Sequence, residues 1–160
     1  MNFVIKQAEE KDIPILIDFV KRLAEYEKLS KEMVATEGIY RDSFFGKEKF
    51  AHAVIGYYED KPVGIAIYFF NFSTFIGRPG LYLEDLFVLP ELRGKGFGKK
   101  LLIYLSKIAV EKRCGRMEWS VLDWNEPAIE FYKSLGAIPM DEWTVFRLTG
   151  DNLKKLAKAE

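Results

Sequence analysis

A short glycine-rich stretch contains the first residues in this chain that could do chemistry. It reads Arg93-Gly94-Lys95-Gly96-Phe97-Gly98 and joins an apolar run to a helical pattern. A helix start exposes backbone N–H groups that have no intrahelical partner, and its dipole favours negative charge. The glycines leave these N–H groups uncovered, so a phosphate oxygen can approach closely. Positive charge comes from four side chains, Arg93, Lys95, Lys99 and Lys100, and the stretch therefore predicts a pyrophosphate-binding loop.

The spacing of this loop excludes two common nucleotide-binding patterns. A Walker loop needs four residues between its glycines and then Lys and Ser or Thr. The dinucleotide fingerprint needs G-x-G-x-x-G, which is absent from this loop. Taken alone, the stretch also fits an ordinary strand-to-helix loop with a few solvated cations, so the rest of the chain must decide.

Two adjacent acids, Glu84 and Asp85, lie inside the apolar run 81–89 before the loop. A carboxylate within an apolar strand costs free energy unless it is paired or functional. Strict alternation places Glu84 with Tyr82, Leu86 and Val88 on one face, and Asp85 with Leu83 and Phe87 on the other. Each acid is either satisfied by a cation or a backbone N–H, or is a pocket acid whose pKa rises on burial. Beside the glycine loop we favour a functional role.

Further candidate residues lie on predicted helices. Tyr132 is about two turns into a helix that Asn125 caps. A phenol can donate a proton to a thiolate leaving group, although a core aromatic is the alternative. Tyr26 and Glu27 lie at the exit of the first helix, where a solvated helix end is the alternative.

Hydrophobic periodicity predicts the elements that must position these residues. Strands are expected at 2–7, 50–58, 63–70, 81–89, 117–122 and 144–148, and helices at 13–27, 36–46, 96–112, 125–136 and 151–158. Asp12 is expected to cap the first helix, Gly64 to mark a bulge or a close approach, and residues 71–80 to form a loop. This order predicts an α/β fold with a mixed, largely antiparallel central sheet and helices on both faces.

Composition narrows the function classes. The 160 residues are 49% hydrophobic and carry no formal net charge, which favours one globular domain over 1–160 and argues against nucleic-acid binding. One cysteine, Cys114, and one histidine, His52, argue against a metal site. The sequence shows no apolar run of about 18 residues and no secretory signal pattern, so we expect a cytoplasmic protein with no membrane partner.

Separated motifs together resemble the GCN5-related N-acetyltransferases (GNAT), and within them the spermidine/spermine, or diamine, N-acetyltransferases. They are Y-L-E-D-L-F-V at 82–88, the loop fitting R-x-x-G-x-G/A, W-N-E-P-A-I-E-F-Y-K-S-L-G-A at 124–137 and L-A-E-Y-E at 23–27. Polyamine-specific members of this family have Asp-Pro-Trp before the acidic strand, whereas Ser73 and Phe75 stand at the places of the acid and the indole here. In this loop, and in V-L-D-W-N at 121–125, the chain more closely resembles the branch of the family that acetylates thialysine and related small amines.

The resemblance implies a fold of the GNAT type and an acetyl-CoA-dependent transfer to a primary amine. The acceptor would be a small cationic molecule, either thialysine- or lysine-like or a polyamine, and transfer would be direct, in a ternary complex without a metal. Acetyl-CoA would be held by the freed backbone of Leu86, Phe87 and Val88, by the loop residues Arg93, Gly94, Lys95, Gly96, Phe97, Gly98 and Lys99, and by Asn125 and Tyr132. The family also implies a homodimer.

By the same resemblance, Glu84 would accept the amine proton and Tyr132 would protonate the CoA thiolate. Tyr26, Glu27, Glu84 and Asp85 would hold the cationic acceptor. The competing hypothesis is a non-catalytic acyl-CoA-binding sensor or interaction module. Such a module would keep the glycine loop but would not need Glu84 and Tyr132.

Overall fold

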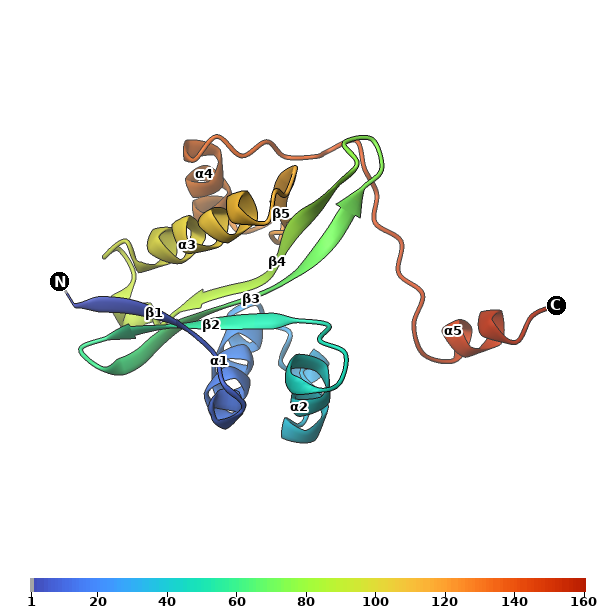
Figure 1. Cartoon of the computed structure of the whole chain (residues 1–160), viewed down its shortest axis with the longest axis horizontal. Helices are drawn as coiled ribbons and strands as arrows, with labels where there is room; N and C mark the ends of the chain where they lie inside the picture. Colours follow the sequence, from blue (N-terminus) through green and yellow to red (C-terminus); the bar gives the residue numbers. More distant parts are fainter. Residues whose placement is uncertain (1) are drawn as a thin grey trace. The chain divides into compact units, whose positions relative to one another are not determined.

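The computed structural model describes residues 2–160, and the chain forms two compact units, Met1–Leu122 and Asp123–Glu160. The first unit contains β1 (Phe3–Gln7), α1 (Ile13–Tyr26), α2 (Glu37–Phe45), β2 (His52–Tyr58), β3 (Lys61–Ser73), β4 (Arg78–Val88), α3 (Phe97–Glu111) and β5 (Arg116–Trp119) (Figure 1). Single 3-10 turns lie at Glu10–Asp12, Ser30–Glu32 and Pro90–Leu92. The second unit contains α4 (Glu126–Ser134) and α5 (Gly150–Ala157).

The first unit is built on one five-stranded sheet in the order β1-β2-β3-β4-β5. The first three strand pairs are antiparallel, and β4 pairs with β5 in parallel. Helices α1 and α2 cover one face of the sheet and α3 covers the other (Figure 1). The predicted mixed, largely antiparallel sheet with helices on both faces is therefore confirmed.

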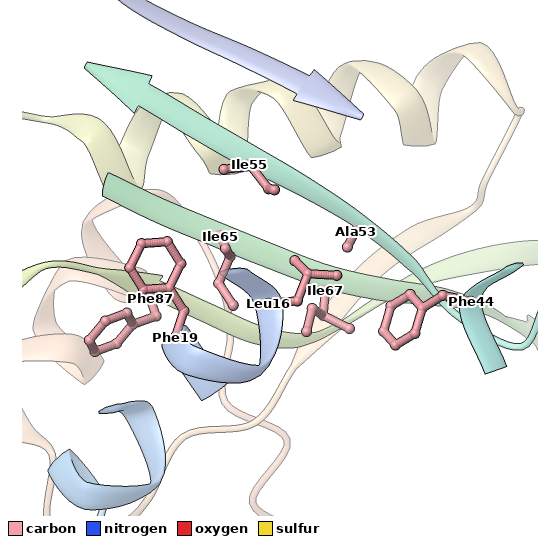
Figure 2. Packing of buried hydrophobic residues seen from close by; sticks show 8 residues of the cluster. All are labelled: Leu16, Phe19, Phe44, Ala53, Ile55, Ile65, Ile67 and Phe87. Carbon is pink, nitrogen blue, oxygen red and sulfur yellow. The ribbon is translucent and has the colours of Figure 1, made fainter. Parts of the chain in front are cut away.

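The core beneath α1 and α2 is a cluster of apolar side chains, most of them from alternate strand positions (Figure 2). Its members are Leu16, Phe19, Phe44, Ala53, Ile55, Ile65, Ile67 and Phe87. The intervening residues of β3, such as Ala66 and Tyr68, are buried on the opposite face. Both faces of the central strands are thus covered, which explains the nearly continuous apolar run in β3.

A bulge in β4 interrupts the expected alternation of its side chains. Ile67 pairs with Asp85, but the next β3 residue, Tyr68, pairs with Leu83, so Glu84 is the extra residue. Because paired residues point to the same face, Asp85 and Phe87 share their face with Tyr82, while Leu86 and Val88 share theirs with Leu83. The sequence predicted Tyr82 on the face of Leu86 and Val88, and Leu83 on the face of Asp85 and Phe87. Both of these predictions are wrong.

The connection between β3 and β4 is shorter than expected. Residues 71–73 and 78–80, which we expected within a loop, are strand, and only four residues turn between Ser73 and Arg78. The Gly77 N–H donates to the Ser73 carbonyl at 2.8 Å, and Gly77 has a φ of 72° that suits glycine. Turn residues misled the prediction because cross-strand pairing extends past them.

Other boundaries also depend on contacts that sequence does not show. Asp12 does not cap α1 with its side chain; it accepts the Glu9 N–H at 2.8 Å and closes the preceding 3-10 turn. Gly64 is the expected close approach, since an added Cβ would lie 2.9 Å from the Phe87 carbonyl oxygen. Thr36 and Asn125 cap α2 and α4 as predicted.

The second unit lacks the predicted strand at 144–148. Residues 137–149 form neither helix nor strand, and Val145 and Phe146 are 86% and 92% exposed. A strand needs a neighbour for its backbone groups, and the described residues of this unit form only two helices. Across residues 2–160, no helix is long and apolar enough to cross a membrane.

Candidate active site

The glycine loop has an open, anion-binding geometry. Gly94 and Gly96 have φ values of 79° and 82°, and an added Cβ at either would meet no atom within 4 Å. Gly96 is the N-cap of α3, and the first helical bond is donated by the Lys100 N–H to the Gly96 carbonyl at 3.0 Å. The N–H groups of residues 97–99 thus have no acceptor within the helix. Uncovered donors at a helix start fit a pyrophosphate.

The Phe97 side chain anchors this loop from below. It is 1% exposed, and its ring stacks on Phe3 at 4.4 Å and lies 5.1 Å from the Tyr58 ring. Phe97 therefore offers a ligand its backbone N–H but not its ring. Lys95, Lys99 and Lys100 are exposed, and the Lys100 ammonium lies 5.6 Å from the centroid of the Phe3 ring.

The Arg93 side chain contacts the ends of β4 and α1. Its Nε donates to the Val88 carbonyl at 3.1 Å. Its guanidinium carbon lies 4.7 Å from the Tyr26 ring centroid and 5.5 Å from the Phe87 ring centroid. These contacts place Arg93 beside a predicted acceptor residue.

The sheet opens next to the loop. The ladder between β4 and β5 begins at Gly80 with Arg116 and ends at Leu83 with Trp119. Beyond that point, Leu86, Phe87 and Val88 pair only with β3 among the described strands. Backbone groups on the β5 side of this segment therefore have no strand partner, as the splayed strand of the predicted cofactor site requires.

Carboxylates gather where the bulge of β4 meets the end of α1. Burial raises the pKa of Asp85 to about 6, with smaller contributions from the charges of Glu84 and Glu27. Burial also raises the pKa of Glu27. Glu84, the extra residue of the bulge, is exposed. The predicted functional acids thus differ, with Asp85 half-buried and Glu84 open to solvent.

Tyr40 is a residue of this site that sequence reasoning missed. It lies on α2 with its ring 5.1 Å from Phe44, and burial and the charge of Asp85 raise its pKa to about 12. Its phenol therefore stays neutral at any working pH. The sequence signals only a helical apolar position, since the proximity to Asp85 depends on how α2 packs on the sheet.

Asn125 and Tyr132 belong to the second unit. The Asn125 Oδ1 accepts the Ala128 N–H at 3.4 Å, and Tyr132 lies two turns further along α4 with its ring 5.8 Å from Phe131. Their approach to the ligands remains a prediction. The structure therefore brings together Tyr26, Glu27, Glu84, Asp85 and Arg93 in the first unit. Within residues 2–160, no group of three or more His, Cys, Asp or Glu side chains could hold a metal ion.

Comparisons with known proteins agree with this geometry. Residues 17–137 match the model of the acetyltransferase (GNAT) family. The chain is 37% identical to the thialysine N-epsilon-acetyltransferase of Bos taurus, covering 98% of this chain and 99% of that protein. It is 29% identical to the L-ornithine N5-acetyltransferase NATA1 of Arabidopsis thaliana, covering 96% and 87%.

A solved structure supports the fold. The integron cassette protein VCH_CASS6 from V. cholerae superposes with a TM-score of 0.83 at 30% identity and 99% coverage of both chains. By sequence over most of its length and by its fold, the chain belongs to the acetyltransferase (GNAT) family.

Proposed function

We propose that this enzyme transfers an acetyl group from acetyl-CoA to a primary amine of a small cationic acceptor, with thialysine- and lysine-like amines ahead of polyamines. One observation carries the proposal. The strand β4 carries a carboxylate cluster at its bulge and leads into an uncovered helix start. The relatives named for thialysine and L-ornithine, both basic amino acids, support the choice of acceptor.

The glycine loop fits the pyrophosphate of CoA. Gly94 and Gly96 leave open space above their backbone, and Lys95 and Lys99 add positive charge. The edge of Leu86, Phe87 and Val88 has no strand partner on the β5 side, although the Val88 carbonyl accepts the Arg93 Nε–H. Such an edge suits an extended amide-containing arm, which adds to a strand edge through backbone hydrogen bonds. Asn125 and Tyr132 are our remaining candidates for cofactor contacts.

The carboxylate cluster suits a cationic acceptor. An alkyl ammonium group has an ordinary pKa of about 10.4, so the acceptor arrives protonated at neutral pH. Glu27 and Asp85 supply charge, and the half-buried position of Asp85 strengthens its attraction for a cation. The Tyr26 ring and the exposed Glu84 carboxylate are the other two predicted acceptor residues.

Side chains of this chain would then move two protons. The exposed Glu84 carboxylate accepts the proton that the amine must lose, directly or through water. The Tyr132 hydroxyl supplies the proton that the sulfur needs as it leaves. Bound acetyl-CoA supplies the activated thioester. We favour direct transfer over an acetylated cysteine intermediate. Burial raises the pKa of the Cys114 thiol, which disfavours the thiolate that such an intermediate would need.

We further propose that residues 1–160 act as one acetyltransferase domain and that the enzyme is a homodimer. The family match at 17–137 crosses the boundary between the two compact units, which supports one domain. Light scattering on a gel-filtered sample gives the mass of the assembly, and a monomeric mass would contradict the second proposal.

The test is CoA release from acetyl-CoA with thialysine, lysine, ornithine, spermidine, spermine, putrescine and a lysine-containing peptide. We expect the highest kcat/KM with thialysine or a related amino acid. A preference for spermidine would refute the order of acceptors while keeping the enzyme. Tight acetyl-CoA binding without release on any amine would favour the sensor hypothesis. Trapping an acetylated enzyme that passes its acetyl group to amine would refute direct transfer.

A further inference from the structure

We propose that the Arg93 side chain is a positioning residue for the acceptor, which ties the end of α1 to the cofactor loop, and is not a pyrophosphate ligand. This inference rests on the proposed function. Its consequence is that cofactor and acceptor bind with positive coupling. The backbone of Arg93 remains part of the loop.

The Arg93 side chain contacts the end of β4 and the end of α1. Its Nε donates to the Val88 carbonyl at 3.1 Å, which fixes the side chain at the end of β4. Its guanidinium then lies over the Tyr26 ring at 4.7 Å, with the Phe87 ring at 5.5 Å. One side chain thus contacts the strand end and the last residue of α1, and its own backbone opens the glycine loop.

Only arginine suits this position. Its planar guanidinium can stack on a ring and donate from Nε at the same time, whereas lysine carries a compact charge without a donor near its stem. Phe87 in turn lies 6.0 Å from Phe19 of α1, so the contact is backed by the core.

The residue that Arg93 holds is next to the carboxylates. Tyr26 precedes Glu27, whose charge contributes to the raised pKa of Asp85. A shift of Tyr26 would therefore move one carboxylate of the acceptor site relative to another. An anion bound to the loop would restrain Arg93 and, through it, Tyr26 and Glu27. Coupling of this kind is reciprocal, so a bound acceptor should also raise the affinity for the cofactor.

The loop does not need the Arg93 guanidinium for the pyrophosphate. Lys95 and Lys99 are exposed on either side of the N-cap Gly96, and the uncovered N–H groups of residues 97–99 follow it. These groups supply charge and donors at the helix start itself. Arg93 is therefore available for the acceptor side.

The experiment compares Arg93→Lys, which keeps the charge but loses the stacking and the Nε donor, with Lys95→Gln, which removes a loop charge. For Arg93→Lys we expect an unchanged Kd for CoA, within about twofold, and an acceptor KM about three- to tenfold higher, the scale of a lost cation–π contact and hydrogen bond. In Arg93→Lys, calorimetry with CoA and thialysine should show that binding of one ligand no longer raises the affinity for the other. For Lys95→Gln we expect weaker binding of CoA, that is a higher Kd, and an unchanged acceptor KM.

Two results would overturn the proposal. One is a loss of CoA affinity of fivefold or more in Arg93→Lys with an unchanged acceptor KM, which would assign the guanidinium to the pyrophosphate. The other is additivity of Arg93→Lys and Tyr26→Leu in a double-mutant cycle on acceptor KM, because residues in contact should be non-additive. The CoA titration needs no acceptor, so it decides whether the Arg93 guanidinium binds the pyrophosphate even if the wild type acetylates none of the amines. That last result would refute the proposed function alone.

Discussion

Asp85 gives a prediction in which stability and function change in opposite directions. Burial raises its pKa from 3.8 to about 6, so the folded state binds this proton more tightly than the unfolded chain does. Its contribution to stability is therefore full at pH values below 3.8. It is lost as the pH rises towards 6, and it stays lost above that. A shift of about two pKa units corresponds to about 3 kcal/mol as an upper value.

The substitution Asp85→Asn removes the charge and keeps the shape. At pH 8 the variant should be more stable than the wild type, by up to about 3 kcal/mol. At pH 4, where the folded wild type holds the proton as well, the gain should be below about 1 kcal/mol. The same variant should raise the acceptor KM, because it removes one carboxylate from the cation site.

Urea unfolding of both proteins from pH 4 to pH 8 measures the first effect. Glu91→Gln is the matched control, since Glu91 is an exposed acid of the same unit, and we expect a change within about 0.5 kcal/mol at every pH. If the stability of Asp85→Asn relative to the wild type does not increase from pH 4 to pH 8, the argument that burial opposes ionisation of Asp85 is refuted. Acceptor KM unchanged in that variant would remove Asp85 from the acceptor site.

Three other substitutions test the chemistry and the loop. Tyr132→Phe should lower kcat by about 100- to 10,000-fold, the usual size of an acid–base contribution, and an unchanged kcat in steady-state assays would remove Tyr132 from the mechanism. Glu84→Gln should lower kcat/KM for the amine most strongly near neutral pH and less at pH 9 to 10, where more amine is already deprotonated; a loss that is equal at all pH values would contradict its role as a base. Gly96→Ala should weaken CoA binding in calorimetry and lower the free energy of unfolding by about 1 to 2 kcal/mol, because alanine is strained at a φ of 82°; unchanged stability would show that the loop adopts another conformation.

The sequence predicted those parts of the molecule that depend on local chemistry. The glycine loop, the start of α3 beside it and the caps at Thr36 and Asn125 follow from residue types at fixed offsets. The acids in β4 were also detectable, because a charge inside an apolar run is unusual. The prediction failed where the limits or the existence of a strand depend on its partner. The strand expected at 144–148 has suitable residues, but the described residues of its unit offer no neighbouring strand.

The bulge at Glu84 shows why pattern alone could not complete the site. Neighbouring acids on a regular strand would point to opposite faces, and neither would be singled out as the exposed one. The bulge depends on the register against β3, where Ile67 and Tyr68 face Asp85 and Leu83, and no local residue type signals it. It leaves Glu84 exposed and keeps Asp85 on the side of α1 and α2, within reach of Glu27 and Tyr40. The register against β3 thus leaves the candidate base exposed and the candidate cation-binding acid half-buried.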